Sequence, residues 1–351
     1  MKILSTQAAV LFESHKPLQI VDISMPEALQ PGQVLVELIT SGICGAQINE
    51  IDAVKGQDKF LPHLLGHEGF ARVVEVGPGV TKLSESDSVI MHWRPSAGIA
   101  AIPPKYGYNG HLVNAGWVTT FNRYAIVSEN RLTKVEPKNF DKFSLPLLGC
   151  ALTTALGVLE NDTKLSPRDS VLIFGFGGVG LSLVLFAKYL KAKKIVVVDI
   201  NSEKETLAES LGVDKFICFT SKDQVATELR NYYGLNLPSL AIETSGKSTS
   251  IELCYEMSSD TAKIILVGVP HLNDKVRLYT LPLHFGKVLT GSKGGGSNPD
   301  SDIPFILRLV ENGEIDLELL PRIVIPFEEI NDGIQMIRKG INGRVVIDFE
   351  A

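Results

Sequence analysis

Two cysteines and a histidine in the first 150 residues have side chains that bind zinc in proteins. Cys44 lies in a glycine-flanked segment after a predicted strand, His67 and Glu68 stand together before the next strand, and Cys150 follows a Leu-Leu-Gly run. Zinc takes Cys, His and carboxylate ligands in a tetrahedron, and a catalytic site keeps one position open or exchangeable. None of these residues has C-x-x-C spacing, so the residues alone allow two interpretations: one shared zinc site, or separate structural roles.

A second stretch with chemical significance is Gly175-x-Gly177-x-x-Gly180, which follows the apolar run 171–174 and begins a segment of helix formers. In a strand–turn–helix unit, the first glycine permits the turn, the second lets a pyrophosphate approach, and the third lets helix and strand pack closely. Free N–H groups at the helix start then face the phosphates. The next apolar run ends at Asp199, at about 20 residues' spacing, where a carboxylate accepts both hydroxyls of an adenosine ribose. Since that carboxylate repels a 2′-phosphate, the sequence predicts NAD rather than NADP.

These residues lie in two halves of the chain that differ in their predicted secondary structure. Up to about residue 150 the chain contains short β-type runs, such as 34–39 and 70–76, separated by turns. After Pro146, apolar runs at 171–174, 195–198, 217–219, 240–242 and 264–267 alternate with helical stretches. That alternation predicts an α/β fold with a doubly wound parallel sheet. From Gly294 onward we expect a loop, a helix over 304–312 and a strand over 345–347.

Composition excludes several classes of function. The 351 residues are 44% hydrophobic and 21% charged, which describes a globular protein with chain enough for two cores. A net charge of −6 offers no basic surface, so neither nucleic acid nor an anionic membrane is an expected partner. Because the amino terminus lacks a signal-peptide core and no apolar run approaches about 20 residues, we expect a cytoplasmic protein. The four cysteines are too scattered for a disulfide framework, and Cys218 and Cys254 are expected to be small buried apolar side chains.

Five segments together resemble the zinc-dependent medium-chain alcohol and polyol dehydrogenases. They are the Cys44 loop, Gly66-His67-Glu68, Leu148-Gly149-Cys150, the fingerprint 175–180, and the tail Asn342-Gly343-Arg344-Val345-Val346. The resemblance spans essentially the whole chain. It implies a GroES-like catalytic domain of residues 1–151 and 294–351, with a Rossmann NAD-binding domain of residues 152–293 between them. It also implies a homodimer formed through the sheet edge near 264–269, with a homotetramer as the alternative.

The resemblance also implies roles for single residues. Cys44, His67 and Cys150 would bind one zinc ion per chain, with Glu68 as an alternating or neighbouring ligand, and Trp93 would lie beside the substrate pocket. Cofactor contacts would come from the fingerprint, which comprises Gly175, Phe176, Gly177, Gly178, Val179 and Gly180. Further contacts would come from Thr154 at the nicotinamide, Asp199 and Lys204 at the ribose, Arg344 at the pyrophosphate, Ser292 near the carboxamide, and Thr244, Val267 and Val269 along the walls.

Three positions depart from the usual pattern of this family. Ala46 and Asn49 stand where relatives carry proton-relaying side chains, and a methyl group cannot relay a proton. Gln47 replaces an aspartate, so the charge that supports a zinc-bound histidine is missing. We therefore expect a bound water, Glu68 or His92 to take over the proton step.

A further departure lies between Met91 and Phe121, where relatives often carry a four-cysteine zinc lobe and this chain has no cysteine. The segment is expected to be a packed Ω-like lobe or a substrate lid, and it leaves the catalytic site as the one zinc site. Its polar groups suit a hydroxylated or anionic ligand, the alternative being that they only solvate a surface lobe. They are His92, Arg94, Lys105, Tyr106, His111 and Asn114.

The sequence therefore predicts a zinc-dependent dehydrogenase that transfers a hydride between NAD(H) and a small alcohol or carbonyl substrate, with a polyol or sugar derivative favoured. One alternative is an alcohol or aldehyde enzyme with an apolar pocket walled by Trp93. Another is an NAD(H)-binding protein without turnover, for which Ala46 and Gln47 would mark the loss of activity.

Overall fold

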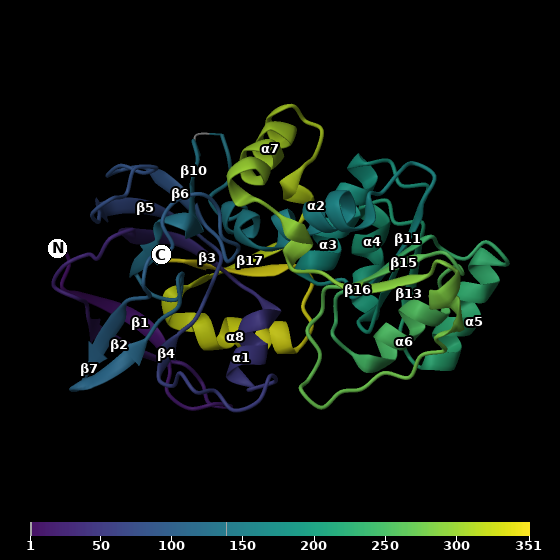
Figure 1. Ribbon diagram of the computed structural model, residues 1–351, viewed down its shortest axis with the longest axis horizontal. Helices are drawn as coiled ribbons and strands as arrows, with labels where there is room; N and C mark the ends of the chain where they lie inside the picture. Colours follow the sequence, from purple (N-terminus) through teal and green to yellow (C-terminus); the bar gives the residue numbers. More distant parts are fainter. Residues whose placement is uncertain (1, 138) are drawn as a thin grey trace. The chain divides into compact units, whose positions relative to one another are not determined.

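The computed structural model describes residues 2–137 and 139–351, and the chain divides into two compact units (Figure 1). Unit 1 comprises Met1–Cys150, Asn298–Asn312 and Pro321–Ala351, and unit 2 comprises Ala151–Ser297 and Gly313–Leu320. The segment 313–320 thus groups with unit 2, whereas the expected boundaries assigned it to the catalytic domain. Within the described chain, every helix is too short or too polar to cross a lipid bilayer.

Unit 1 is built from a closed barrel and a seven-stranded sheet. The barrel order is β1 (Ser5–Leu11), β2 (Gln19–Ser24), β7 (Lys105–Tyr108), β8 (His111–Asn114) and β4 (His63–Leu64). The sheet order is β10 (Leu132–Lys134), β6 (Ser88–Met91), β5 (Gly69–Val76), β3 (Gln33–Ile43), β18 (Arg344–Asp348) and β17 (Arg322–Pro326), with β9 (Tyr124–Ser128) paired to β3. Figure 1 shows the yellow β17 among the purple and blue strands of this unit. Strand β17 pairs with β18, and β18 pairs with β3, so strands from the two ends of the chain form one sheet.

Short helices complete unit 1. They are α1 (Gly45–Ile51), α7 (Pro299–Glu311), α8 (Ile330–Arg338) and the 3-10 turns η1 (Glu129–Arg131), η2 (Leu145–Gly149) and η8 (Phe327–Glu329). Helix α7 begins five residues earlier than predicted because Pro299 occupies its first turn and Asp300 and Asp302 face its positive end. Val34, Val36, Met91, Val345 and Ile347 are among the fully buried side chains of the core.

The cysteine-free segment between Met91 and Phe121 contains a hairpin that closes the barrel. Strand β7 pairs with β2, β8 pairs with β4, and Asn109 and Gly110 link β7 to β8 with φ angles of 49° and 78°. Two successive positive φ values are the requirement of a type I′ turn, which Asn-Gly satisfies. The segment was expected to be an Ω-like lobe or lid; the structure instead pairs its middle portion into the barrel.

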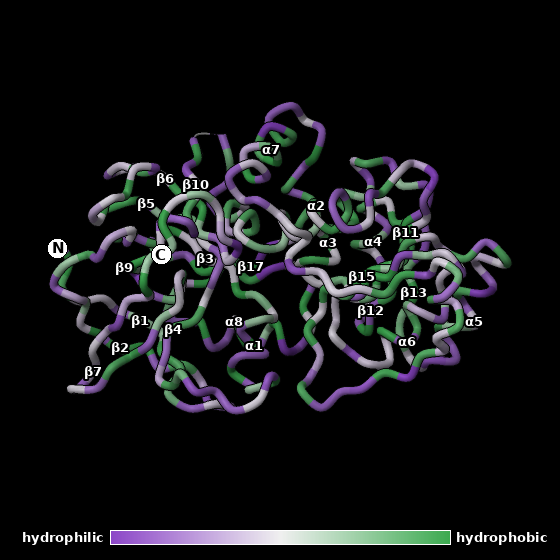
Figure 2. Tube along the Cα trace, in the orientation of Figure 1, coloured by the Kyte–Doolittle hydropathy of each residue, from purple (hydrophilic) through white to green (hydrophobic). Residues whose placement is uncertain are grey.

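Unit 2 is a six-stranded parallel sheet. Its order is β13 (Lys215–Cys218), β12 (Lys194–Asp199), β11 (Ser170–Phe174), β14 (Leu240–Glu243), β15 (Lys263–Leu266) and β16 (Val288–Gly291). The order reverses between β11 and β14, as in doubly wound nucleotide-binding folds. Figure 2 shows hydrophobic residues along the central strands, which are apolar on both faces because helices cover a parallel sheet.

The helices of unit 2 are α2 (Ala151–Gly157), α3 (Gly178–Tyr189), α4 (Glu205–Ser210), α5 (Lys222–Tyr233) and α6 (Ser248–Glu256). Shorter turns are the π-helical η3 (Val158–Thr163) and the 3-10 turns η4 (Ser202–Lys204), η5 (Leu281–Phe285), η6 (Gly294–Gly296) and η7 (Leu317–Leu319). The fold class predicted from the sequence, a Rossmann sheet plus a β-rich GroES-like domain, is confirmed.

Candidate metal and cofactor sites

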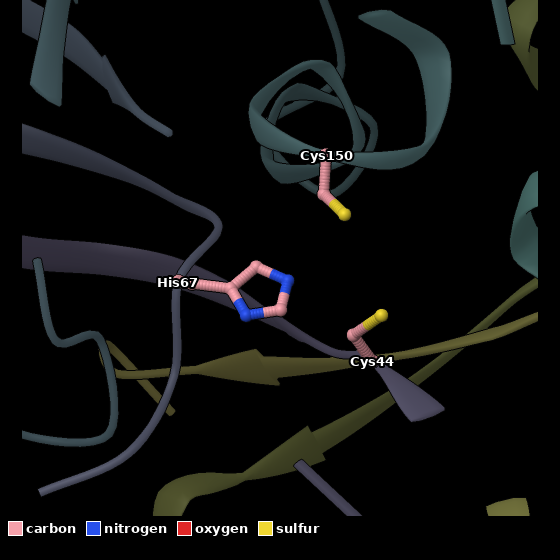
Figure 3. A group of neighbouring side chains, drawn as sticks. All are labelled: Cys44, His67 and Cys150. Carbon is pink, nitrogen blue, oxygen red and sulfur yellow. The ribbon is translucent and has the colours of Figure 1, made fainter. Parts of the chain in front are cut away.

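Cys44, His67 and Cys150 converge in unit 1. One ligand atom from each of the three side chains lies within 4.8 Å of the other two. Figure 3 shows the imidazole and the two sulfur atoms pointing toward one another from three separate segments. The spacing along the chain left open whether these residues meet, and the fold brings them to one point.

Local backbone geometry places each of the three residues. Cys44 is the residue between β3 and α1 and has extended backbone angles. His67 follows Gly66, whose φ of +89° is strained for other residues. Cys150 follows Gly149, where a Cβ atom would lie 2.2 Å from the carbonyl oxygen of Met91 at the end of β6. Glycine at position 149 therefore allows the Cys150 segment to pack against the strand ends that carry the other two residues.

The chemistry of this trio fits a zinc ion. His67 Nε2 is buried without a hydrogen-bond partner among the described residues. A hydrogen bond with Cys150 lowers the pKa of Cys44, assisted by the charge on Arg344, and the same hydrogen bond raises the pKa of Cys150. A divalent cation that bound both sulfurs would displace the protons of the thiols. Two sulfurs and one imidazole nitrogen are a known ligand set for catalytic zinc, with the fourth position left open.

Gln47 connects two of the candidate ligands. Its Oε1 accepts the backbone N–H of Cys44 at 3.0 Å, and its Nε2 lies 2.6 Å from His67 Nδ1. Because the amide oxygen is held by Cys44, the amide N–H faces Nδ1 and favours the ring tautomer that carries its proton on Nε2. Zinc binding through Nε2 needs the opposite tautomer. The glutamine therefore occupies the supporting position that an aspartate holds in relatives and does so with the less suitable group.

Glu68, the neighbour of His67, forms an ion pair with Arg344. It is fully buried, and the Arg344 guanidinium donates to its Oε1, whereas Oε2 has no partner among the described residues. Burial raises the pKa of Glu68, and Arg344 opposes that rise. Gly42 makes room for this pair, since a Cβ atom there would lie 2.3 Å from Glu68 Oε1. Arg344, predicted as a pyrophosphate ligand, is thus engaged by Glu68 in this structure.

His92 has no ring nitrogen available for the relay role considered above. The residue is fully buried, Nδ1 donates to the Arg94 carbonyl at 2.7 Å, and Nε2 lies 3.0 Å from Thr133 Oγ1. Burial lowers the pKa of His92 to about 4, so the ring is neutral near pH 7. Thr133 Oγ1 also lies 2.7 Å from Asp300 Oδ1, so His92 belongs to a polar cluster beside α7.

The polar residues of the 92–114 segment do not gather into one site. Tyr106 is buried in the barrel, where its hydroxyl accepts the N–H of Ile126. Asn114 donates to the Phe60 carbonyl, and Lys105 and His111 are exposed. Trp93 and Arg94 follow His92 just after the end of β6, the strand that pairs with β5.

Glu50 is a carboxylate that the sequence analysis missed. It lies on α1 three residues after Gln47, so the two side chains share one face of the helix. The side chain is exposed at the surface. Partial desolvation by the surrounding protein raises the pKa of its carboxyl group, and the attraction of His67 opposes that rise. The i to i+3 spacing from Gln47 is a signal that could have identified it. Glu50 is the acidic residue of the helix that follows Cys44, and it interacts electrostatically with His67.

In unit 2 the three fingerprint glycines perform the three roles that the motif predicts. Gly175 has a φ of +91°, and a Cβ there would lie 2.4 Å from Thr244 Oγ1. A Cβ at Gly180 would lie 2.1 Å from the Gly175 carbonyl oxygen, which makes the close helix–strand contact possible only for glycine. Gly177 has no described atom within 4 Å of such a Cβ, so the space above it is open to a ligand. The first N–H groups of α3 border this space.

Asp199 lies at the end of β12, as the motif requires. Its carboxylate accepts the Phe176 N–H at 2.6 Å and the Asn201 N–H at 3.0 Å, and it pairs with Lys204 Nζ at 3.2 Å. The carboxylate is therefore held at the fingerprint turn by two backbone donors and one cation. Asp199 and Lys204, the acidic and the basic residue predicted to contact the adenosine ribose, thus form an ion pair with each other.

The remaining predicted cofactor residues lie on unit 2 in varied surroundings. Thr154 is buried in α2, and Thr244 donates to the carbonyls of Phe174 and Gly175. Val267 is half-buried and Val269 is exposed. Ser292 donates to Asp162 Oδ2 at 2.6 Å and accepts the N–H of Gly295 at 2.8 Å, so its hydroxyl orders the triglycine turn η6.

Comparisons with known proteins agree with this architecture. A family model described as zinc-binding dehydrogenase matches residues 178–312, and one described as alcohol dehydrogenase GroES-like domain matches residues 30–137. S-(hydroxymethyl)glutathione dehydrogenase of Escherichia coli O1:K1 / APEC is 29% identical over 375 aligned residues, which cover 99% of this chain and 100% of that protein.

Two solved structures are similar over nearly the whole chain. Benzyl alcohol dehydrogenase from Acinetobacter calcoaceticus has a TM-score of 0.86 at 26% identity, covering 99% of both chains. CAD from Helicobacter pylori complexed with NADP(H) shares the fold, with a TM-score of 0.78 at 20% identity over 99% of both chains.

A metal-ligand trio on a GroES-like unit and a dinucleotide fingerprint on a parallel sheet define an oxidoreductase of the alcohol dehydrogenase type. The chain belongs to the zinc-dependent medium-chain alcohol dehydrogenase family.

Proposed function

We propose that this enzyme uses NAD and one zinc ion per chain to oxidise a hydroxyl group of a polyol or sugar derivative, or to reduce the corresponding carbonyl. The observation that carries the proposal is the convergence of Cys44, His67 and Cys150, each of which offers its ligand atom within 4.8 Å of the others. Zinc held there supplies a Lewis acid for the substrate oxygen, and the nicotinamide supplies the hydride acceptor. The residues of the chain bind, orient and move protons around them.

The preference for NAD rests on Asp199. Its carboxylate is fixed at the turn by the N–H of Phe176 and is available to the two hydroxyls of an adenosine ribose. A 2′-phosphate would bring like charges together at the same point. CAD from Helicobacter pylori shares the fold and is complexed with NADP(H), so the fold by itself does not select NAD and the proposal rests on the strand-end residue.

Cofactor binding is proposed to use backbone N–H groups and side chains whose positions the fold already fixes. The N–H groups of Gly178, Val179 and Gly180 at the start of α3 receive the pyrophosphate above the open space at Gly177. Lys204 joins Asp199 at the ribose, Thr154 and Ser292 serve the nicotinamide end, and Arg344 remains the proposed pyrophosphate cation.

The proton that leaves the substrate hydroxyl is proposed to go to Glu50, directly or through a bound water. Ala46 and Asn49 cannot act as bases, His92 has both nitrogens engaged, and Glu68 is paired with Arg344. Glu50 interacts electrostatically with His67, burial raises its pKa, and it has access to solvent. Those three properties suit a general base.

Initial rates with NAD and NADP across a panel of alcohols, polyols and sugar derivatives at alkaline pH, followed by the absorbance of the reduced cofactor, test the proposal. We expect turnover of a hydroxylated substrate, a preference for NAD and one zinc per chain by elemental analysis. Turnover confined to apolar alcohols would favour the apolar-pocket alternative, and zinc-free protein that binds NADH tightly would favour the non-catalytic one.

The partner proposed for the chain itself is a second copy, bound along β16. The sheet edge was expected near 264–269, but β15 (Lys263–Leu266) pairs with β14 and β16, so β16 is the edge strand. This strand ends the sheet and pairs on one side only, and Val288, Tyr279 and Phe285 near it are exposed apolar side chains. An uncovered edge with apolar neighbours is a site of strand-to-strand association. Light scattering coupled to size exclusion distinguishes the expected dimer from a tetramer or a monomer.

A further inference from the structure

Glu243 is a fully buried carboxylate at the end of β14, and the proposed chemistry gives it no role. Its Oε1 accepts the N–H groups of Ser245 at 2.7 Å and Gly246 at 3.0 Å, and the Ser245 hydroxyl donates to the same oxygen. Oε2 also accepts the Gly246 N–H, at 3.0 Å. All of these partners are donors, so the geometry selects the ionised carboxylate, which only accepts. Burial raises the pKa of Glu243, and these hydrogen bonds oppose that rise. The carboxylate therefore closes the turn 244–246 over itself.

The backbone of Glu243 ties this turn to the end of β15. Its carbonyl oxygen accepts the N–H groups of Val267 at 2.8 Å and Gly268 at 3.0 Å. A Cβ atom at Gly268 would lie 2.1 Å from the Gly246 nitrogen and 2.8 Å from Glu243 Oε2. The segment 267–269 is thus packed against both the turn and the carboxylate.

The turn also contacts the fingerprint that follows β11. The N–H of Thr244 donates to the Phe174 carbonyl at 2.8 Å, and its hydroxyl donates to the carbonyls of Phe174 at 2.9 Å and Gly175 at 3.2 Å. Phe174, Glu243 and Leu266 are register partners on neighbouring strands. The ends of β11, β14 and β15 are therefore linked through this one turn, and all of these residues belong to unit 2.

The ends of β14 and β15 lie on the side of the sheet where the nicotinamide half of the cofactor is expected. Asp199, proposed for the adenosine ribose, ends β12, on the opposite side of β11 from β14 and β15. A dinucleotide spans the point where the strand order of a doubly wound sheet reverses, so its two halves lie on opposite sides of β11. Thr244, Val267 and Val269, all predicted to line the cofactor, follow β14 and β15 directly.

We propose that Glu243 is a positioning residue, whose carboxylate fixes the turn 244–246 and the segment 267–269 as the wall against which the nicotinamide half of the cofactor packs. The identity of the cofactor rests on the proposed function. Glu243 acts through its neighbours, because it is fully buried. Without the carboxylate, the N–H groups of Ser245 and Gly246 lose their acceptor, and the turn has to rearrange to satisfy them.

Two ligands separate the positioning of this wall from a general loss of structure. Fluorescence titration measures the dissociation constant for NADH on the zinc-loaded protein, and calorimetry measures it for ADP-ribose, which lacks the nicotinamide. In Glu243→Ala we expect the constant for NADH to rise about 10- to 100-fold, as for loss of hydrogen bonds to a charged group. Glu243→Gln keeps one acceptor oxygen, so the rise should be smaller, about 3- to 10-fold. The constant for ADP-ribose should change less than about twofold in both, because the adenosine half contacts other strand ends.

Two variants in unit 2 serve as controls. Glu209→Gln changes an exposed carboxylate on α4 and should bind both ligands like the wild type. Asp199→Asn changes the residue proposed for the adenosine ribose and should weaken the binding of NADH and ADP-ribose alike. The emission maximum of bound NADH is a second readout, since it reports the surroundings of the nicotinamide. We expect Glu243→Gln to shift it toward the value of free NADH, and Glu209→Gln to leave it unchanged.

The outcomes distinguish this proposal from the proposed function. Circular dichroism checks the fold of each variant, and Glu243→Gln decides the matter if Glu243→Ala does not fold. NADH affinity equal to that of the wild type in the folded variants overturns the proposal, and so does an equal loss of affinity for NADH and ADP-ribose. Wild-type protein that prefers NADPH contradicts the proposed use of NAD. The role of Glu243 is then tested in the same way with NADPH and 2′-phospho-ADP-ribose.

Discussion

Gln47 is the residue whose chemistry departs most from what a zinc-bound histidine needs. A carboxylate at this position has two acceptor oxygens, one for the Cys44 N–H and one for His67 Nδ1–H, whereas the amide offers one acceptor and directs its N–H at the ring. Gln47→Glu keeps the side-chain length and supplies the second acceptor. We expect the variant to bind zinc about 10- to 100-fold more tightly, the range seen when such partners of metal ligands are changed.

Competition with a zinc chelator measures this affinity directly and does not require activity. Gln33→Glu is a suitable control, because that glutamine is also buried but lies at the start of β3 and donates to the Ile102 carbonyl. A Gln47→Glu variant with unchanged or weaker zinc binding would show that the amide already presents its oxygen to the ring.

Glu50 is expected to set the acidic limb of the pH–rate profile for alcohol oxidation. Burial raises the pKa of its carboxyl group. Attraction to His67, His63 and Lys55 opposes the rise, and the negative charge of Cys44 adds to it. A base must be deprotonated to accept the proton, so the rate should increase as pH rises through this pKa. Glu50→Gln should lower kcat about 100-fold or more and remove that limb.

Glu13→Gln, which changes an exposed carboxylate elsewhere in unit 1, serves as the control and should leave the profile unchanged. If Glu50→Gln keeps both kcat and the acidic limb, the proton leaves by another route.

Gly42 and Gly45 form a matched pair for testing the buried ion pair of Glu68 and Arg344. An alanine Cβ at position 42 would lie 2.3 Å from Glu68 Oε1 and 2.8 Å from its Cδ, whereas at position 45 no described atom lies within 4 Å. Gly42→Ala must therefore displace Glu68 within a fully packed region, which typically costs about 1–3 kcal/mol of the free energy of unfolding. Gly45→Ala, at the first residue of α1, should leave that free energy unchanged or raise it by less than about 1 kcal/mol. Urea unfolding compares the two, and equal midpoints would contradict the packing argument.

Residue types alone indicated the trio of metal ligands but not their meeting point. Cys44, His67 and Cys150 are distant along the chain, and only the packing of Gly149 against Met91 brings the last of them to the first two. Glu50 followed from helical spacing once α1 was known to begin at Gly45, directly after Cys44. The contact between Arg131 and Trp93 could not have been predicted, because it depends on the pairing of β6 with β10.

At the scale of elements, a buried chain of hydrogen bonds joins β6, β10 and the start of α7. His92 Nε2 lies 3.0 Å from Thr133 Oγ1, Thr133 Oγ1 lies 2.7 Å from Asp300 Oδ1, and Asp300 pairs with Lys82 at 2.7 Å. Polar side chains of three elements thereby contact one another inside unit 1. The neutral state of His92 within this chain makes its contribution to stability dependent on pH.

The sign of that dependence follows from the pKa of His92, which is about 4 when folded against an ordinary value of 6.5. As pH falls from 6.5 toward 4, His92 becomes protonated in the unfolded chain but stays neutral in the folded chain. The free energy of unfolding therefore falls across this window. The full difference corresponds to about 3 kcal/mol. His92→Gln cannot titrate, and its free energy of unfolding should decline less steeply over the same window.

Urea unfolding of the wild type and His92→Gln at several pH values between 4 and 7 gives this difference, since the carboxylates common to both proteins cancel. Parallel curves for the two proteins would show that His92 is protonated in the fold.

The barrel hairpin shows where element prediction from sequence stopped. Asn109-Gly110 is a strong signal for a two-residue hairpin turn, but the flanking segments are only four residues each and carry Lys105 and His111 at exposed positions. Their strand character comes from pairing with β2 and β4, which are distant along the chain. The central strands of unit 2 were predictable because strands buried on both faces are continuous apolar runs.

At the scale of the molecule, the two kinds of chemistry are built in separate compact units. The metal-binding trio lies wholly in unit 1, and the fingerprint with Asp199 lies wholly in unit 2. After Pro146 the sequence pattern changes from short β-type runs to alternating β and α segments. That change indicated the division, because alternating β and α segments form a domain of their own. The assignment of residues 313–320 to unit 2 could not be predicted, since a short segment between α7 and β17 contains no signal for the sheet it joins.

This separation predicts what removal of the metal does. A chelator should abolish turnover, because Cys44, His67 and Cys150 lose the ion that their sulfur and nitrogen atoms surround, and NADH binding should persist, because Gly175, Gly177, Gly180 and Asp199 need no metal for their geometry. Elemental analysis should find one zinc per chain before treatment, and NADH fluorescence titration should be carried out before and after it. Restored turnover on adding back zinc shows that the loss is not unfolding. Turnover that survives complete removal of zinc would contradict the role assigned to the trio, and zinc-free protein as isolated, with tight NADH binding, would identify a binding protein instead of an enzyme.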